Sequence, residues 1–332
     1  MALVSDGALT KSLYIAKEAA FGTTPAAASY HVRANPVPLP DSDDELVDFG
    51  MQGTGKPYAY AQHRAKGILR GRFSTEGPLN AAVIQYHLIP LFSSIGTVVT
   101  GTKYKFDGTY SAAQITRSAS VGAVLDTGEW VCVKGAIPTS FTLRAARPQG
   151  DNKCTFSSEW VGLNRTRETA PTAPTSDALA PWTTMPNVTV DFTTPALTGE
   201  LLQEFTLTVV NNANVVYTNV ATGGKHILGE VVATGEIVAC YGSVGGGAEL
   251  GRELVEEWET YATNLAFAVT FGSSTNLCVV TCRGAASGPP KFESGNSYRS
   301  IRFPFVCLGD GTNPGVSFEV DNGVAPTWAA LA

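Results

Sequence analysis

The stretch Phe205-Thr-Leu-Thr-Val209 alternates apolar and polar residues with a period of two, and Phe141-Thr-Leu-Arg-Ala145 does the same. Because successive side chains of a β-strand point to opposite faces, each stretch predicts a strand with one face on a core. Similar alternating stretches recur along most of the chain, and Gly, Pro, Asn or Asp residues separate one stretch from the next. We expect further strands at 12–16, 30–39, 67–76, 103–107, 130–135, 153–161, 187–193, 225–240, 266–283, 301–305 and 316–320. The chain is therefore predicted to be mainly antiparallel β.

Two segments have a helical period instead. In 78–93 the apolar residues fall near helical spacing after Gly77-Pro78, and proline is favourable at a first helical position. In 249–262 the apolar residues form one stripe, and the glutamates lie mostly elsewhere. Two helices are too few to cover both faces of a parallel sheet, which argues against a doubly wound α/β fold. We expect a β-sandwich or barrel with one or two flanking α-helices.

The composition excludes several classes of protein. The 332 residues include 23 Lys and Arg against 29 Asp and Glu, and a net charge of −6 does not suit a protein that grips phosphate backbones. Only 16% of the residues are charged, below the ~25% of a typical soluble domain. No stretch is apolar enough to span a membrane, and the first residues do not resemble a signal peptide, so we expect folding in the cytoplasm without membrane insertion. The six dispersed cysteines predict buried thiols.

Two glycine-rich motifs imitate nucleotide sites, and neither is complete. Residues 50–56 match the GxxxxGK part of a phosphate-binding loop, but Pro57 stands where a Ser or Thr would ligate Mg²⁺. Residues 245–251 have the spacing GxGxxxG instead of GxGxxG. The four histidines form no metal-ligand pair, and Cys278 and Cys282 lie too far apart on a strand to share an ion. The sequence therefore predicts no catalytic residue, no cofactor and no bound metal.

The long loop at 40–66 carries acidic residues at its start and basic residues at its end. The acidic end of one copy can therefore meet the basic end of its neighbour. Exposed ion pairs are each worth about 0–1 kcal/mol, so these contacts would set register and orientation more than stability. We interpret the loop as a contact between subunits. The candidate residues are Asp41, Asp43, Asp44, Glu45, Asp48, Arg64, Lys66, Arg70 and Arg72.

Several stretches occur in an order that resembles one protein family. Lys11–Ala26 leads from a strand into the pattern E-x-x-x-G-T-x-P-A, which begins at Glu18. The later stretches are 71–78 and the helix that follows it, 138–144, 154–162, 204–212, 253–271 and the closing strand Ile-Arg-Phe-Pro-Phe. Over most of its length the chain resembles the tail tube protein (major tail protein) of long-tailed bacteriophages.

This resemblance implies a single tail-tube domain over 1–332, with possible inserted elements at 97–135 and 166–186. The second of these is rich in Pro, Thr and Ala, which favours an extended crossing segment. Subunits of the family assemble into stacked six-membered rings around a DNA channel, and the loop at 40–66 would be an arm between subunits. The implied partners are further copies of the chain, other tail proteins (tape measure, tail terminator and baseplate proteins), and DNA in transient, non-specific passage. The implied location is the virion tail, after assembly in the host cytoplasm.

Two other functions stay open at this point. A non-enzymatic β-sandwich binding or adhesin module of a virion or cell surface could use exposed aromatic residues such as Tyr58 and Tyr60, or the acids at 41–48. Calcium-dependent folding or glycan binding by a monomer would favour it. An enzyme would use the glycine loop at 50–56, and thermal stabilisation by ATP that is lost in Lys56→Ala would favour that reading. Formation of rings or tubes would favour the structural protein.

Overall fold

The computed structural model describes most of the chain, and strands make up the larger part of it. The described residues are 10–32, 39–42, 46–47, 63–64, 71–108, 117–146, 154–174, 183–194, 202–217, 224–227, 229–241, 250–260, 265–294 and 299–328. The strands are β1 (Thr10–Lys17), β2 (Tyr30–Val32), β3 (Asp41–Ser42), β4 (Leu46–Val47), β5 (His63–Arg64), β6 (Gly71–Pro78), β7 (Thr97–Thr100), β8 (Lys103–Asp107), β9 (Ala119–Leu125), β10 (Glu129–Ala146), β11 (Thr155–Gly162), β12 (Asn164–Thr169), β13 (Val188–Thr194), β14 (Leu202–Asn211), β15 (Asn214–Tyr217), β16 (Gly224–Ile227), β17 (Val231–Tyr241), β18 (Leu265–Ser273), β19 (Asn276–Ala286), β20 (Lys291–Ser294), β21 (Arg299–Cys307) and β22 (Val316–Asp321). The helices are α1 (Ala81–Phe92), α2 (Leu250–Glu259) and the 3₁₀ turn η1 (Met185–Asn187).

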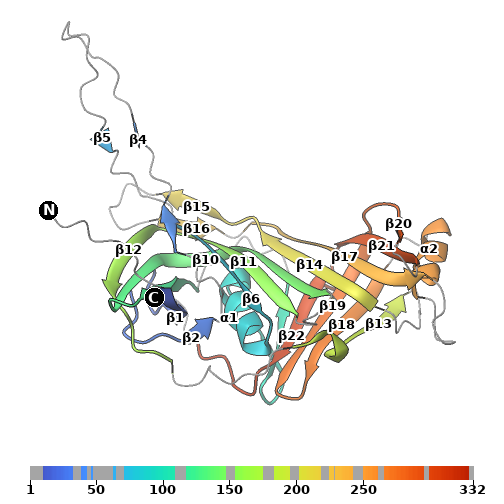
Figure 1. Cartoon of the computed structure of the whole chain (residues 1–332), viewed down its shortest axis with the longest axis horizontal. Helices are drawn as coiled ribbons and strands as arrows, with labels where there is room; N and C mark the ends of the chain where they lie inside the picture. Colours follow the sequence, from blue (N-terminus) through green and yellow to red (C-terminus); the bar gives the residue numbers. More distant parts are fainter. Residues whose placement is uncertain are drawn as a thin grey trace, which may run out of the picture.

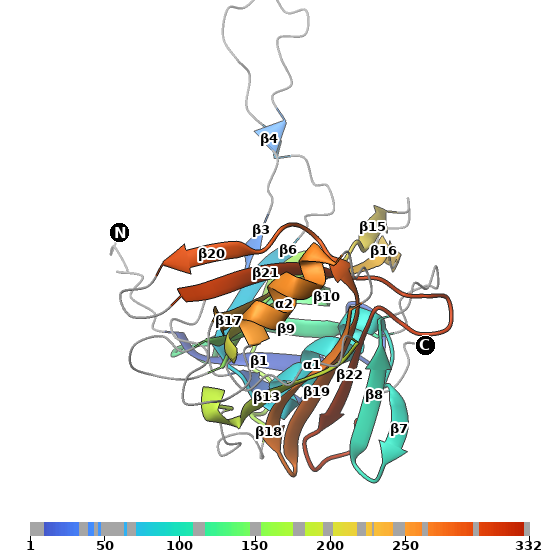
Figure 2. The same ribbon diagram turned by 90° about the vertical axis from the view of Figure 1, so that its right-hand side faces the viewer.

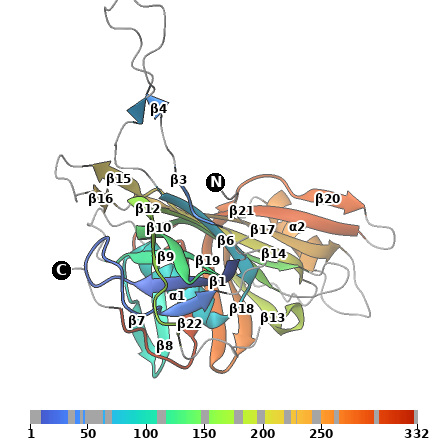
Figure 3. The ribbon, with the colours of Figure 1, turned by 60° about the vertical axis from the view of Figure 1, so that its left-hand side comes forward.

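The long strand β10 is shared by two sheets (Figure 3). Its first part pairs with β9 and β12 in a small sheet of order β2-β1-β9-β10-β12. Its second part pairs with β11 and β14 in a large sheet. The register with β9 shifts between Val133 and Ala136, and Gly135 there has φ of +57°, a left-handed conformation that glycine adopts without strain. A glycine at the shift therefore lets one strand serve both sheets.

The large sheet has two branches. The first branch runs β3-β6-β11-β10-β14-β17-β21-β20, and the second runs β13-β18-β19-β22-β8-β7. They join where Phe305–Cys307 of β21 pairs with Gly284–Ala286 of β19. All of these pairings are antiparallel, and within the described residues none of them closes a ring. The mainly β prediction is confirmed, and in the form of a branched open sheet.

The two helices have different places. Helix α1 packs against β10 on one side and against β19 and β22 on the other, and nine of its 12 residues are buried (Figure 2). It is therefore enclosed by the sheet. Helix α2 flanks the sheet and packs on β17 and β21 at one end of the molecule (Figure 1). The helix predicted from Pro78 begins later, because Pro78 ends β6 and the Asn80 side chain accepts a hydrogen bond from the Val83 N–H, which fixes the first turn.

Several strands were not predicted from alternation, and three of them, β7, β9 and β12, have a clear physical reason. All seven residues of β9 are buried, because β9 lies between β1 and β10 with both faces covered. Strand β7 is short, and all four of its residues are exposed. Strand β12 corrects the expectation of a crossing segment at 166–186, since residues 166–169 pair with β10. Its polar residues are typical of an edge strand, and Glu168 forms an ion pair with Lys134 of β10.

His87 of α1 lies at the centre of the core. Its ring is fully buried, and its centroid lies 5.0–5.3 Å from those of Phe141, Phe156 and Trp160. Nδ1 lies 2.7 Å from the Val83 carbonyl oxygen, to which an N–H at that position donates. Burial lowers the pKa of His87 to about 4, because the charged ring would lose its hydration among aromatic groups. The folded subunit therefore keeps this histidine neutral.

Acid is expected to destabilise the subunit through His87. An unfolded histidine has a pKa of about 6.5, so the unfolded state takes up the proton first as the pH falls. The stability that depends on the neutral ring is fully present above pH ~6.5 and is lost between pH ~6.5 and ~4, by about 3 kcal/mol. We expect this step in the free energy of unfolding by urea to disappear in His87→Leu and to persist in His31→Leu, which replaces a half-buried histidine. An unchanged step in His87→Leu would contradict the assignment.

Candidate assembly interface and channel surface

The second branch ends in two strand edges. Among the described residues, β7 pairs only with β8 and β13 pairs only with β18. An edge strand presents backbone N–H and C=O groups that another chain can pair with. Apolar residues of β13 alternate with the exposed Thr189, Asp191 and Thr193, so this edge covers the core on one side only. The branch thus has two ends at which a sheet can be extended.

Strand β7 is more exposed than an ordinary edge strand. Val98 is 63% exposed and Val99 is 44% exposed, although neighbouring residues of a strand point to opposite faces. Both faces of β7 are therefore uncovered in the subunit. Its register with β8 shifts between Val98 and Thr100, which marks a β-bulge. An exposed apolar edge of this kind is typical of a surface that another chain covers.

The first branch has a face rich in hydroxyl groups, which we call the hydroxyl face. It is the outward side of β6, β11, residues 140–146 of β10, β14 and β17, whose other side covers the core. Four of its residues lie directly opposite one another across four strands: Ser157 of β11, Thr142 of β10, Thr208 of β14 and Thr234 of β17. The hydroxyl oxygens of Thr142 and Thr208 are 3.0 Å apart. The period-two prediction for these strands is confirmed.

Acids outnumber bases on the hydroxyl face. Its charged residues are Arg72, Glu76, Arg144, Glu159, Glu204 and Glu236. Arg144 Nε lies 2.9 Å from Glu204 Oε1, so this guanidinium is already paired. Glu236 is paired with Arg302 of the adjacent β21. Lys and Arg side chains bind a polyanion because they neutralise its phosphates and release the counterions around them. A surface of hydroxyls, paired cations and additional carboxylates therefore has little capacity to hold a polyanion.

A comparison of the sequence with family models assigns the chain. Residues 9–307 match the model described as phage tail tube protein, which is most of the 332 residues. The chain belongs to the phage tail tube protein family. The resemblance read from the sequence is therefore confirmed, and the family places this tail tube protein among the structural proteins of the virion tail. No curated protein matches its sequence.

The structure places part of the charged loop of this tail tube protein. Asp41 lies opposite Arg72 in the pair β3 and β6, and Leu46 lies opposite Arg64 in the pair β4 and β5. Residues at the start of the loop therefore pair through their backbones with residues at or just after its end, within one chain. Strands β4 and β5 stand apart from the other strands (Figure 1). A contact between subunits at these residues stays a prediction. The other candidates, Asp43, Asp44, Glu45, Asp48, Lys66 and Arg70, lie outside the described residues.

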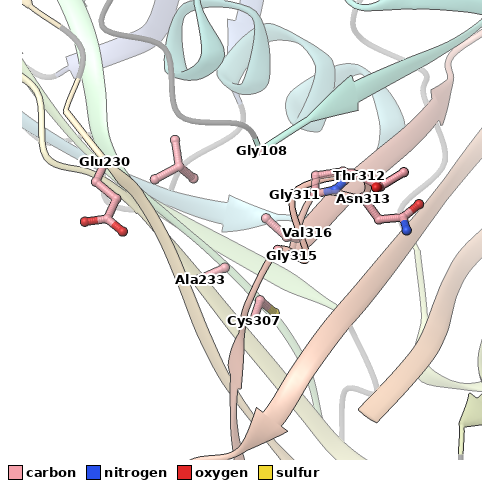
Figure 4. A pocket seen from close by; sticks show the side chains of 12 residues that line it. Gly108, Glu230, Ala233, Cys307, Gly311, Thr312, Asn313, Gly315 and Val316 are labelled. Carbon is pink, nitrogen blue, oxygen red and sulfur yellow. The ribbon is translucent and has the colours of Figure 1, made fainter. Parts of the chain in front are cut away.

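The described part of the tail tube protein contains no group of three potential metal ligands. No helix in that part is long and apolar enough to cross a bilayer. The glycine motif at 50–56 lies outside the described residues, as does most of 245–251. Gly251 lies in α2, where an added Cβ would be 2.3 Å from the Cys240 carbonyl oxygen, so this glycine permits close packing of the helix. A cavity of about 330 Å³ lies near the junction of the branches and is lined largely by glycine and small apolar residues (Figure 4).

Proposed function

We propose that this chain is the repeating subunit of the tail tube and that copies join through the edges of the second branch, six to a ring, with rings stacked into the conduit. The observation that carries the proposal is the pair of uncovered edges, β7 and β13, at opposite ends of one six-stranded branch. Joining β7 of one copy to β13 of the next is a head-to-tail contact, which closes into a ring when the rotation between copies permits. Each such contact covers Val98 and Val99 and pairs two sets of backbone groups.

The hydroxyl face supports a second part of the proposal, that this surface lines the channel. DNA that must slide through a channel needs a channel surface that does not neutralise its phosphates. Neutralisation releases counterions from the DNA and so makes binding favourable. The face offers hydroxyls and carboxylates, and Arg144 is held by Glu204. Passing DNA is then a transient, non-specific partner.

The remaining features follow from tail assembly. The partners are further copies of the chain and the tail proteins at and within the tube, of which tape measure, terminator and baseplate proteins are the expected classes. The subunits assemble in the host cytoplasm before the virion is released. The whole chain acts as one tail-tube domain with the loop at 40–66 as an arm, and 97–135 and 166–186 as its added elements. No step of this function requires catalysis.

Charge on β7 is expected to block assembly without unfolding the subunit. Because Val98 and Val99 are exposed, Val98→Asp with Val99→Asp removes little buried apolar area from the monomer, and we expect a change in unfolding free energy of at most about 1 kcal/mol. In a joined edge the same carboxylates would be buried, so tubes seen by negative-stain microscopy should be lost. Val324→Asp introduces a carboxylate at a 64% exposed valine that belongs to neither edge strand and should leave tubes intact. Normal tubes from the double variant would exclude β7 as an interface.

The channel assignment can be tested by the size of reagent that reaches the hydroxyl face. In Ser157→Cys the new thiol should react with both a small maleimide and a large polyethylene-glycol maleimide in free subunits. In tubes it should react with the small reagent and be protected from the large one. Thr127→Cys, on the exposed turn between β9 and β10, should react with both reagents in both states. Equal labelling of Ser157→Cys by the large reagent in tubes would place this face on the outside.

The loop at 40–66 is tested by deletion of residues 44–64. The deleted residues contribute no described pairing except that of β4 with β5, so the shortened subunit should keep its fold and its thermal unfolding midpoint. We expect fewer or shorter tubes by light scattering and microscopy, because an arm between copies is removed. Unchanged polymerisation would show that the arm is dispensable.

A further inference from the structure

Cys282 and Cys307 come together where the two branches meet. Cys307 of β21 lies directly opposite Gly284 of β19, and Cys282 is two residues from Gly284 on the same face of that strand. The pairing of the strands therefore makes the Cys307 side chain a neighbour of the Cys282 side chain. Both cysteines are free.

The backbone geometry at this junction favours a bond between the two sulfur atoms. Diagonal neighbours on one face of an ordinary antiparallel pair are about 7–8 Å apart, slightly beyond the usual span of a disulfide. Here the strands approach more closely, because Gly284 has no side chain. A Cβ on Gly284 would lie 1.8 Å from the Val306 carbonyl oxygen and 2.9 Å from the Cys307 Cα. The N–H of Leu308 also donates to the Arg283 carbonyl oxygen at 2.8 Å, which holds the two strands together beside the cysteines.

The two thiols differ in their access to solvent. Cys307 is half-buried and lines the cavity of about 330 Å³, with Ala233 and Val316 beside it (Figure 4). Cys282 is 1% exposed and is not among the residues that line this cavity. A small oxidant in the cavity can therefore reach Cys307 first, and Cys282 is placed to react with the product.

We propose that Cys282 and Cys307 form a redox-sensitive pair that closes to a disulfide and fastens the junction of the two branches. With a peroxide as oxidant, the Cys307 thiol takes up one oxygen atom to give a sulfenic acid, and the peroxide leaves as water. The Cys282 sulfur then attacks the Cys307 sulfur, the sulfur–sulfur bond forms, and the hydroxyl group leaves as a second water. Both electrons lost by the pair of thiols are taken up by the peroxide.

The pair is suited to slow closure after assembly. Burial raises the pKa of Cys282 well above its usual range, and the neighbouring Cys307 thiol raises it further. Because the thiolate is the attacking species, closure at neutral pH is slow and should accelerate as the pH rises. This use rests on the proposed function, in which subunits fold in a reducing cytoplasm and later meet an oxidising medium in the released virion. The bond would then restrain the angle between the branch with the hydroxyl face and the branch with the assembly edges.

The proposal is tested on the purified full-length chain. After treatment with dilute hydrogen peroxide, denaturation and alkylation, the number of reactive thiols should fall from six to four, and peptide mapping should find Cys282 joined to Cys307. The midpoint of thermal unfolding should rise by roughly 2–5 °C and return after reduction. Cys307→Ser should abolish both changes, whereas Cys240→Ser, which removes a buried thiol outside the pair, should keep them. Tubes and unassembled subunits are assayed separately, so the disulfide can be confirmed or rejected whether or not the chain forms tubes.

Two results would overturn the proposal. One is retention of all six reactive thiols after oxidant treatment at pH values from about 7 to about 9, the range over which a thiolate normally becomes available. The other is a mapped disulfide between different cysteines, or one that forms equally in Cys307→Ser. If Cys307→Ser fails to fold, Cys282→Ala provides the same comparison, and mapping of the wild-type chain decides independently of any variant.

Discussion

The arrangement of the subunit depends on one buried carboxylate. Glu18, at the end of β1, is 1% exposed and accepts hydrogen bonds from Ser118, Ser120 and the N–H groups of Gly22 and Gly135. Burial raises the pKa of Glu18, and the four donors offset part of that rise. The bond to Gly135, at 2.8 Å, holds the point at which β10 leaves the small sheet and enters the large one. Each of these donors would cost about 1–3 kcal/mol if left unpaired in the interior. The carboxylate therefore fixes the point at which β10 passes from one sheet to the other, which we call the joint.

The joint determines where the hydroxyl face lies. Beyond Gly135, β10 becomes the centre of the first branch and directs Thr142 outward and Phe141 inward. The inward side receives α1 and His87, which fill the space between the branches. The outward side forms the hydroxyl face. The low charge of the chain, 16% of residues, is therefore partly explained, because a broad outward surface is built from Ser and Thr where a soluble domain would carry more Lys and Glu.

Alternation predicted the strands whose two faces have different environments, such as β14 with Phe205 inward and Thr208 outward. It could not predict β9, because a strand that is covered on both faces does not alternate between apolar and polar residues. It could not predict β7 either, because both faces of that strand are exposed. The start of α1 was misplaced because Asn80 caps the helix through a side-chain bond that composition does not reveal. The charged loop was visible in the sequence, but the uncovered edges β7 and β13 were not. An edge is a property of pairing, and pairing between distant segments depends on the whole fold.

In the proposed assembly, the two edges of the second branch must accept a copy of the chain and reject other strands. A long, flat apolar edge would pair with many partners and aggregate. Strand β7 has only four residues and a bulge after Val98, which limits the length and register of any partner. Strand β13 carries the exposed Asp191, a charge that disfavours burial against an arbitrary strand. Since the edges belong to one branch but differ in sequence, the proposed contact is head-to-tail. In the proposed ring, closure depends on the angle between the branches, which the Cys282–Cys307 junction influences.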